Sequence, residues 1–404
     1  MPRSGAWFPT GEPGGLRPEP SDRRPACLSG PLLARLVRDA DLSTTFELGA
    51  LMRVVSVVGN RPQFVKAAPL HLALAPLADV VMVDTGQHYD HGLAGIFYDE
   101  LRIAPPTHRL EVGSGTHAET TARVLERIEP VLAAEAPDWV VVYGDTNSTL
   151  AAALAAVKLG LRVAHVEAGL RSFDRSMPEE VNRVLVDAVA DLLLCPSDVA
   201  VRNLGAEGVT RGVHVVGDVM ADAARLFGPL ADRLPRPDPP YVLATIHREA
   251  NTRQPALGRL VAVLSGLGER VILPLHPRTA AAIAAYGLAF GPSVDVREPA
   301  GYLEFTALLR GARALVTDSG GAQKEAYFHG VPCVTLRETT EWVETVESGW
   351  NVLAGDDAAA ISAAVARPAP AERPALYGDG HAAGRIAALL AQTTSGDSPD
   401  GSTR

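Results

Sequence analysis

Residues 161–183, LRVAHVEAGLRSFDRSMPEEVNR, carry the pattern that decides the fold. An apolar run at the start of this stretch ends at the carboxylate of Glu167. Pro178 then opens a helical pattern whose first turn carries Glu179 and Glu180. Carboxylates at the end of a strand and at the start of the next helix lie at the edge where open α/β sheets bind ligands. Burial and mutual repulsion can raise the pKa of such acids, as general acid–base chemistry requires.

Similar apolar runs, separated by helical patterns, recur along the chain from residue 53 onward. They predict parallel strands with both faces covered by helices. The predicted strands are Arg53–Val58, Val80–Asp84, Trp139–Tyr143, Arg162–Val166 and Leu192–Cys195 in a first series, and Tyr241–Thr245, Val271–Leu275, Val294–Arg297, Ala314–Thr317 and Cys333–Leu336 in a second. We therefore expect an α/β protein of two doubly wound, Rossmann-like domains that face each other across a cleft.

Composition suggests where these domains begin and end. Residues 1–51 are rich in Pro, Gly and Arg without sustained periodicity, which predicts a disordered extension. An alternative hypothesis is that the natural chain starts at Met52, directly before the first strand. The predicted parts that follow are a first domain over 52–220, a second over 221–375, a helix over 376–392 that crosses back to the first domain, and a disordered tail over 393–404.

The overall composition excludes several classes of partner. A formal net charge of −10 argues against a nucleic acid, which requires a basic surface. The chain has no run of eighteen apolar residues, so we expect no membrane-spanning helix. Its three scattered cysteines form no metal or disulfide pattern and fit a reducing cytoplasm. Only Lys66, Lys158 and Lys324 among the 37 Lys and Arg residues are lysines, so each lysine is notable.

Polar segments follow other strands of the first series. Arg61, in a Gly-Asn-Arg-Pro turn, is suited to bind a phosphate at a helix N-terminus, although a surface arginine would look the same. Lys66 is equally compatible with a functional and a solvent-exposed position. The loop DTGQHYD, residues 84–90, is more polar than a connection requires. Asp145 either caps the next helix or faces the cleft, and both roles can hold.

The second series has two histidines at strand ends and one phosphate-binding pattern. His247 and His276 follow successive strands, which favours an acid–base role for one and a phosphate or base contact for the other. In DSGGAQKEA, residues 318–326, a Ser-Gly-Gly turn opens a helix whose backbone N–H groups can hold an anion, and Glu325 can accept hydrogen bonds from ribose hydroxyls. Neither a Walker sequence nor a GxGxxG fingerprint is present, so no bound NAD is indicated.

Taken in order, these motifs resemble the non-hydrolysing UDP-N-acetylglucosamine 2-epimerases. The resemblance covers residues 52–392 and includes GNRPQFVKAAP, DTGQHYD, GDTNST, HVEAGLRS, MPEEVNR, HREAN, LHPRT, DSGGAQKEA and RETTEWVE. It implies a GT-B fold, a cytoplasmic homodimer, no NAD or metal cofactor, and a UDP-sugar substrate used for cell-surface polysaccharide precursors. The implied reaction eliminates UDP to a 2-acetamidoglucal and re-adds it after reprotonation of C2 on the opposite face.

The resemblance also implies a set of site residues. The acid–base and orienting residues are Asp145, Glu167, Glu179 and His247, whereas Glu180 is assigned to the helix. The predicted substrate-binding residues are Arg61, Lys66, Gln87, His88, Arg183, His276, Arg278, Ser319, Gly320, Gly321, Glu325 and Arg337. Arg183 lies four residues after Glu179 and is expected either to orient that carboxylate or merely to pair with it.

The chain departs from the usual motifs of this family at three places. It has Gly-Asn-Arg-Pro-Gln where many members have Gly-Thr-Arg-Pro-Glu, Gln323-Lys324 where others are polar or acidic, and Glu341-Trp342-Val343-Glu344 in place of a Glu-Arg-Pro pattern. These variants resemble a branch that includes epimerases of UDP-2,3-diacetamido-glucuronic acid, whose carboxylate Lys66 or the pair Arg171 and Arg175 could bind. A GT-B glycosyltransferase, a hydrolysing epimerase and a non-catalytic UDP-sugar binding protein are the remaining alternatives.

Overall fold

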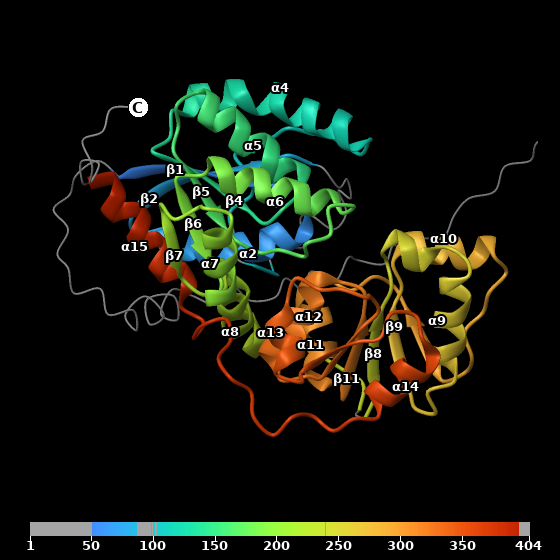
Figure 1. Ribbon diagram of the computed structural model, residues 1–404. Helices are drawn as coiled ribbons and strands as arrows, with labels where there is room; N and C mark the ends of the chain where they lie inside the picture. Colours follow the sequence, from blue (N-terminus) through green and yellow to red (C-terminus); the bar gives the residue numbers. More distant parts are fainter. Residues whose placement is uncertain (1–50, 87–97, 99, 102, 239, 396–404) are drawn as a thin grey trace, which may run out of the picture. The chain divides into compact units, whose positions relative to one another are not determined.

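A computed structural model describes residues 51–86, 98, 100–101, 103–238 and 240–395. The predictions for residues 1–50 and 396–404, and for Gln87 and His88, lie outside this part. Two parallel β-sheets flanked by helices form the described fold, which confirms the predicted α/β class (Figure 1). Because all strands within each sheet are parallel, their carboxyl ends share one edge.

The first sheet has seven strands in the order β3-β2-β1-β4-β5-β6-β7. Its strands are β1 (Met52–Val58), β2 (Ala78–Asp84), β3 (His108–Arg109), β4 (Trp139–Tyr143), β5 (Val163–Val166), β6 (Leu192–Cys195) and β7 (Val213–Val215). The helices of this half are α2 (Arg61–Leu74), α4 (His117–Glu135), α5 (Asn147–Lys158), α6 (Pro178–Val189), α7 (Asp198–Ala206) and α8 (Val219–Ala231). Alternate valines of β1 belong to two different hydrophobic clusters, so both faces of the sheet are buried.

The second sheet has six strands in the order β10-β9-β8-β11-β12-β13. Its strands are β8 (Val242–Thr245), β9 (Val271–Pro274), β10 (Val294–Arg297), β11 (Ala314–Thr317), β12 (Cys333–Thr335) and β13 (Asn351–Leu353). Its helices are η1 (Glu249–Thr252), α9 (Ala256–Ser265), α10 (Pro277–Ala285), α11 (Tyr302–Gly311), α12 (Gly320–His329), α13 (Val343–Glu347) and α14 (Ala358–Val365). Strands β8 and β11 pair side by side at the centre of this sheet, so the residues that follow them are neighbours.

All ten predicted strands are present, and the described residues form three further strands that the sequence did not predict. These are β3, β7 and β13, each two or three residues long and each at the end of a sheet. A strand at a sheet edge is covered on fewer sides, so its sequence lacks a continuous apolar run. None of the three has a fully buried side-chain pattern, in contrast to β4, β5 and β6.

The last helix, α15 (Ala382–Ser395), contributes to the core of the first sheet. Ile386 and Leu390 are fully buried in the cluster that also contains residues of β1 and α2. The predicted disordered tail began at residue 393, whereas the helix continues to Ser395. The reason is a polar attachment, because the indole N–H of Trp139 donates to Thr394 Oγ1 at 3.0 Å.

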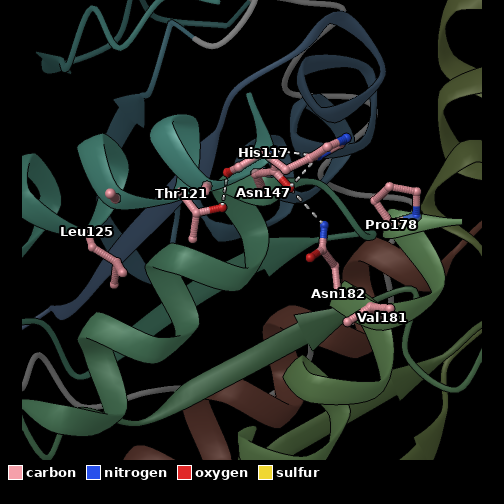
Figure 2. Close-up of a pocket in the computed structure, with 9 residues that line it drawn as sticks. His117, Thr121, Leu125, Asn147, Pro178, Val181 and Asn182 are labelled. Atoms are coloured by element: carbon pink, nitrogen blue, oxygen red, sulfur yellow. Dashed lines mark hydrogen bonds between the residues drawn. The ribbon is translucent and has the colours of Figure 1, made fainter. Parts of the chain in front are cut away.

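Helices α4, α5 and α6 enclose a surface hollow of about 560 Å³ (Figure 2). Its lining residues are His117, Ala118, Thr121, Ala122, Leu125, Asn147, Pro178, Val181 and Asn182. The amide of Asn147 links His117 to Asn182 along the polar side of this hollow, and Asn182 donates to the backbone oxygen of Asp145 at 2.9 Å. The hollow is therefore adjacent to one of the predicted site residues.

Candidate active site

Glu167 is the first residue after β5, and its backbone has a φ of +74°. Residues other than glycine rarely occupy this left-handed region, and such outliers concentrate at functional sites. The side chain is buried and forms ion pairs with Lys66 of α2 and Lys324 of α12. Gly144, at the end of β4, leaves room for this cluster, because a Cβ there would lie 3.2 Å from the Lys66 ammonium.

The sequence suggested that burial raises the pKa of these acids, but the pKa of Glu167 is lowered. Burial alone would raise its pKa, but the ammonium groups of Lys324 and Lys66 outweigh burial and lower the pKa to about 2. The carboxylate is therefore ionised at neutral pH. It can accept a proton, but in this arrangement two ammonium groups make it a weak base.

Asp145 follows β4 and faces Arg183 of α6. The alternative role of Asp145 as a helix cap is not observed, because Thr146 caps α5 by accepting a hydrogen bond from the Thr149 N–H. The Arg183 guanidinium is almost completely buried and pairs with both Asp145 and Glu180. Asp145 thus has a partly exposed carboxylate that is paired with a buried cation.

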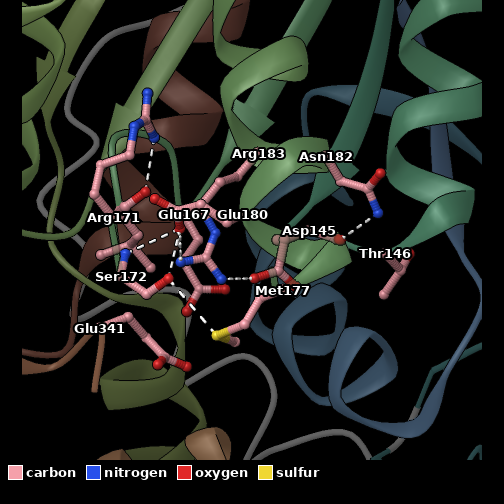
Figure 3. A network of polar contacts seen from close by, with 12 residues as sticks. Asp145, Thr146, Glu167, Arg171, Ser172, Met177, Glu180, Asn182, Arg183 and Glu341 are labelled. Atoms are coloured by element: carbon pink, nitrogen blue, oxygen red, sulfur yellow. Dashed lines mark hydrogen bonds and ion pairs between the residues drawn. The ribbon is translucent and has the colours of Figure 1, made fainter. Parts of the chain in front are cut away.

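The two consecutive glutamates of α6, Glu179 and Glu180, have different environments, and Figure 3 shows that of Glu180. Glu180 accepts hydrogen bonds from the backbone N–H groups of Ser172 and Phe173, both at 2.9 Å, and pairs with Arg183. Glu180 therefore fixes the loop after β5, a role beyond its predicted assignment to the helix. Glu179 is partly exposed, and no side-chain hydrogen bond or ion pair of Glu179 is found within the described ranges. Its carboxylate remains available, and its catalytic role stays a prediction.

A buried charge network begins at His165 in β5, the strand that directly precedes Glu167. His165 contacts Asp187 through Nδ1 and the backbone oxygen of Gly144 through Nε2, both at 2.7 Å. Asp187 also accepts from Arg171, whose guanidinium is 1% exposed and pairs with Glu207 as well. Arg171 was expected to be able to bind a sugar carboxylate, and this interpretation is wrong because its side chain is enclosed by protein acids.

The turn after β1 is packed against two neighbouring strand ends. A Cβ at Gly59 would lie 2.4 Å from Thr85 Oγ1, so only glycine fits. Gln63 accepts from the Gly59 N–H and donates to the backbone oxygen of Tyr143, both at 2.7 Å. An amide can make both bonds, whereas a glutamate carboxylate could only accept. Arg61, at the start of α2, donates to the backbone oxygen of Ala300 at 2.7 Å.

In the second sheet, His247 forms a pair with Asp318. The His247 Nδ1 lies 3.1 Å from Asp318 Oδ1, and the backbone N–H groups of His247 and Arg248 donate to the same carboxylate. Burial would raise the pKa of Asp318, but the bonds from His247 and these N–H groups lower it. An ionised carboxylate therefore orients a half-exposed imidazole. The ring of His276 lies 5.8 Å from that of His247, and its Nδ1 accepts from the Arg278 N–H.

The N-terminus of α12 has the features expected for an anion site. Ser319 caps the helix, and a Cβ at Gly320 would lie 2.7 Å from Glu341 Oε1. A Cβ at Gly321 would meet open space, so the backbone there is accessible. Burial raises the pKa of Glu325 to about 7, although the positive charges of Arg61 and Lys324 oppose this.

Two buried donors lie beside this helix start without a partner. Arg337 pairs with Glu341 at 2.9 Å, but its second terminal nitrogen makes no hydrogen bond to any described residue. The Trp342 Nε1–H is also buried and unpaired within the described chain. Unpaired buried donors are costly, so both are suited to an oxygen-rich ligand.

Sequence reasoning missed three charged residues of this site. Lys324 and Asp218 complete the cluster around Glu167, and Asp318 orients His247. The scarcity of lysine was a signal for Lys324, and the position of Asp318 at the end of a strand was a signal for that aspartate. No group of three or more metal-binding side chains is found in the part of the chain that the structure describes. No helix in that part is long and apolar enough to span a membrane.

A doubly wound α/β pair with ionisable side chains at strand ends and a glycine-rich helix start is typical of enzymes that act on a phosphate-bearing ligand. The protein-family model described as UDP-N-acetylglucosamine 2-epimerase matches residues 71–391. The chain belongs to this family of 2-epimerases, which are isomerases.

Three relatives illustrate the similarity. A Methanococcus maripaludis protein named UDP-N-acetylglucosamine 2-epimerase homolog is 44% identical over 84% of this chain and 99% of its own length. The Pseudomonas aeruginosa UDP-2,3-diacetamido-2,3-dideoxy-D-glucuronate 2-epimerase is 45% identical over 84% of this chain and all of its own. A third relative is the Methanocaldococcus jannaschii UDP-GlcNAc 2-epimerase, whose crystal structure contains UDP-GlcNAc and UDP. This structure matches the present one with a TM-score of 0.80 and 38% identity, over 84% of this chain and all of the M. jannaschii chain.

Proposed function

We propose that the protein interconverts UDP-GlcNAc and UDP-ManNAc for the synthesis of cell-surface polysaccharide precursors. A base takes the C2 proton, the C1–O bond breaks, and UDP leaves with the bonding electrons, so that a C1–C2 double bond forms. Reprotonation of C2 on the opposite face and attack of the UDP oxygen on C1 then give the epimer. The reaction is an isomerisation with no net redox change.

The observation that carries this proposal is the placement of Glu167. Its ionised carboxylate occupies a strained backbone position at a strand end and contacts Lys324 of the helix whose N-terminus is suited to bind phosphate. Lys324 thus links a proton acceptor, Glu167, to the helix whose N-terminus is suited to bind phosphate. This arrangement fits a reaction in which the substrate loses a proton and a phosphate-bearing leaving group together.

Two faces of C2 require two groups that transfer protons. Glu167, Asp145 held by Arg183, the available Glu179, and His247 oriented by Asp318 are our candidates for these acid–base and orienting roles. Arg61, Ser319, Gly320, Gly321 and Glu325 are our candidates for the UDP site, with the backbone N–H groups of α12 facing a phosphate. Relatives in the family whose structures contain UDP or UDP-GlcNAc support a ligand of this kind.

The test is incubation of the protein with UDP-GlcNAc in D2O. We expect deuterium at C2 of the recovered UDP-sugar, detected by NMR, together with UDP-ManNAc. Release of UDP and free sugar without return to the UDP-sugar would favour a hydrolysing epimerase. Transfer of the sugar to an acceptor without C2 exchange would contradict the proposal and favour a glycosyltransferase.

A second sugar deserves the same assay. The relative named for UDP-2,3-diacetamido-2,3-dideoxy-D-glucuronate is as similar to this chain as the M. maripaludis homolog. Lys66 remains a candidate partner for the carboxylate of that sugar, whereas the enclosed Arg171 does not. Parallel assays of the two substrates should show which has the higher kcat/KM, and C2 exchange on the diacetamido-glucuronate alone would overturn the assignment to UDP-GlcNAc.

We further propose that the protein is a cytoplasmic homodimer. Cys195 and Cys333 are buried free thiols, which is compatible with a reducing compartment. Helix α6 presents four large apolar side chains that are at least one-third exposed: Val181, Val184, Leu185 and Val189. Of these, Val181 also lines the hollow of Figure 2. A second copy would cover such an apolar stripe. Light scattering should give a dimer that a Leu185→Asp substitution weakens, and a monomeric wild-type protein would refute this proposal.

A further inference from the structure

Two of the three lysines of the chain meet at one carboxylate. Lys66 and Lys324 both form ion pairs with Glu167, whereas Lys158 is exposed at the end of α5. All the other Lys and Arg residues are arginines. In a chain with this preference, two lysines at one buried acid indicate positions where a guanidinium cannot replace an ammonium group.

The surroundings of Lys324 leave its ammonium group little freedom. The Nζ atom lies 2.5 Å from Glu167 Oε1 and 2.5 Å from Asp218 Oδ2, and its side chain is 1% exposed. It also lies 3.9 Å from the centre of the Trp342 ring. A compact ammonium group can donate to two carboxylates while it faces an aromatic ring. A planar guanidinium is wider and would displace one of these three partners.

Asp218 connects Lys324 to the start of helix α8. It is the N-cap of α8, and its Oδ1 accepts from the Met220 N–H at 2.8 Å. The other oxygen, Oδ2, accepts from Lys324. The start of α8 therefore fixes the ammonium group, and the ammonium group in turn fixes one oxygen of Glu167.

Lys324 lies on α12, and Trp342 directly precedes α13. Because the Lys324 ammonium faces the Trp342 ring and pairs with Glu167, these two segments form one local feature beside Glu167 on the side of α12. The other oxygen of Glu167 faces Lys66 from the side of α2. The carboxylate is thus held from both sides by point charges rather than by hydrogen-bonding neutral groups.

We propose that Lys324 is a positioning residue that fixes the carboxylate of Glu167 for proton transfer at C2, and that this position requires lysine. The inference rests on the proposed epimerase function. Lys324 acts through Glu167, so its loss should impair the chemical step more than the binding of UDP. Arginine retains the charge but not the compact shape, so it should not restore the rate.

The test compares Lys324→Met and Lys324→Arg with the wild-type protein, and uses Lys158→Met as the matched control. We expect kcat for C2 exchange to fall by about 100-fold in both Lys324 variants, in the range typical for impaired acid–base catalysis. The affinity for UDP, measured by calorimetry, should change by less than about threefold. The kinetic isotope effect with C2-deuterated substrate should increase, because proton transfer becomes more rate-limiting. Lys158→Met should behave as wild type.

Lys324→Met leaves Asp218 without its ion-pair partner and can fail to fold. The double variant Lys324→Met with Asp218→Asn removes both charges, leaves Glu167 paired with Lys66, and should show the same loss of kcat. Wild-type kcat in the folded double variant, or full activity of Lys324→Arg, would overturn the inference. Absence of C2 exchange in the wild-type protein would instead refute the proposed function itself.

Discussion

Replacement of Glu167 by glutamine removes a charge and keeps the shape of the side chain. Two consequences follow from the structure. The glutamine amide cannot accept the C2 proton, so exchange should be lost. The ammonium groups of Lys66 and Lys324 also lose a buried counter-ion, so the folded state should be destabilised.

The size of the stability effect follows from the pKa of Glu167. This pKa is lowered from 4.5 to about 2, because the two lysines outweigh burial. At about 1.4 kcal/mol per pKa unit, ionisation of Glu167 contributes about 3 kcal/mol to the free energy of unfolding at pH 7. Removal of one partner from a buried ion pair typically costs about 3–5 kcal/mol, which agrees. Because the folded pKa is depressed, this contribution is complete above pH 4.5 and disappears as the pH falls toward 2.

Denaturant unfolding of wild type and Glu167→Gln at pH 7 and pH 3 measures this effect, and calorimetry with UDP tests whether the binding site survives. We expect the variant to be less stable by about 3 kcal/mol at pH 7, with a smaller difference at pH 3. C2 exchange should fall by at least about 100-fold while UDP still binds. Near-normal exchange would refute the acid–base assignment, and equal stability at pH 7 would refute the ion-pair reasoning.

The remaining predictions concern three other acids and one arginine. Glu179→Gln should reduce C2 exchange without loss of stability. Glu180→Gln should instead lower the free energy of unfolding by about 1–3 kcal/mol, because Glu180 binds Ser172, Phe173 and Arg183. If the exchange and unfolding assays gave the reverse, the roles assigned to the two glutamates would have to be exchanged. Arg61→Ala should weaken UDP binding about tenfold or more in calorimetry, and unchanged affinity would remove Arg61 from the UDP site. Burial raises the pKa of Glu325 to about 7, so its ionisation destabilises the fold as the pH rises from 4.5 to 7. Glu325→Gln should therefore be more stable than wild type at pH 8, by up to about 3 kcal/mol, and equal to it near pH 4; a constant difference across this range would contradict the assignment.

The central strands of both sheets were predictable because burial on both faces leaves a continuous apolar run in the sequence. The edge strands β3, β7 and β13 were not, although a fourth edge strand, β10, was predicted. The formation of the three missed strands depends on a neighbouring strand that supplies hydrogen bonds rather than on their own side chains. The extension of α15 past residue 392 depends similarly on the indole N–H of Trp139, which is distant in sequence. The pattern of apolar residues in one sequence indicates which segments are buried. It does not show which distant residues pair, and both the edge strands and the end of α15 depend on such contacts.

The strand-end positions of the candidate site residues were also predictable. Glu167, Asp145 and His247 follow strands whose carboxyl ends lie at one edge of their sheet, the edge where parallel sheets usually bind ligands. The pairing of charges was not predictable. The sequence spacing suggested that Arg183 pairs with Glu179, but the helix directs Arg183 toward Glu180 and Asp145. Equally, nothing in the sequence around Arg171 reveals that Asp187 and Glu207 enclose its guanidinium.

The departures from the usual motifs show why residue identity must be interpreted together with its contacts. Gln63 replaces a common glutamate, and its amide both accepts from Gly59 and donates to the Tyr143 carbonyl, so a neutral hydrogen-bonding group joins two strand ends. Lys324 introduces a positive charge that lies between the carboxylates of Glu167 and Asp218. A negatively charged side chain at position 324 would place three carboxylates together in a buried space and would raise their pKa values. Lysine at position 324 therefore acts together with Lys66 to keep Glu167 ionised, and it also neutralises the buried carboxylate of Asp218.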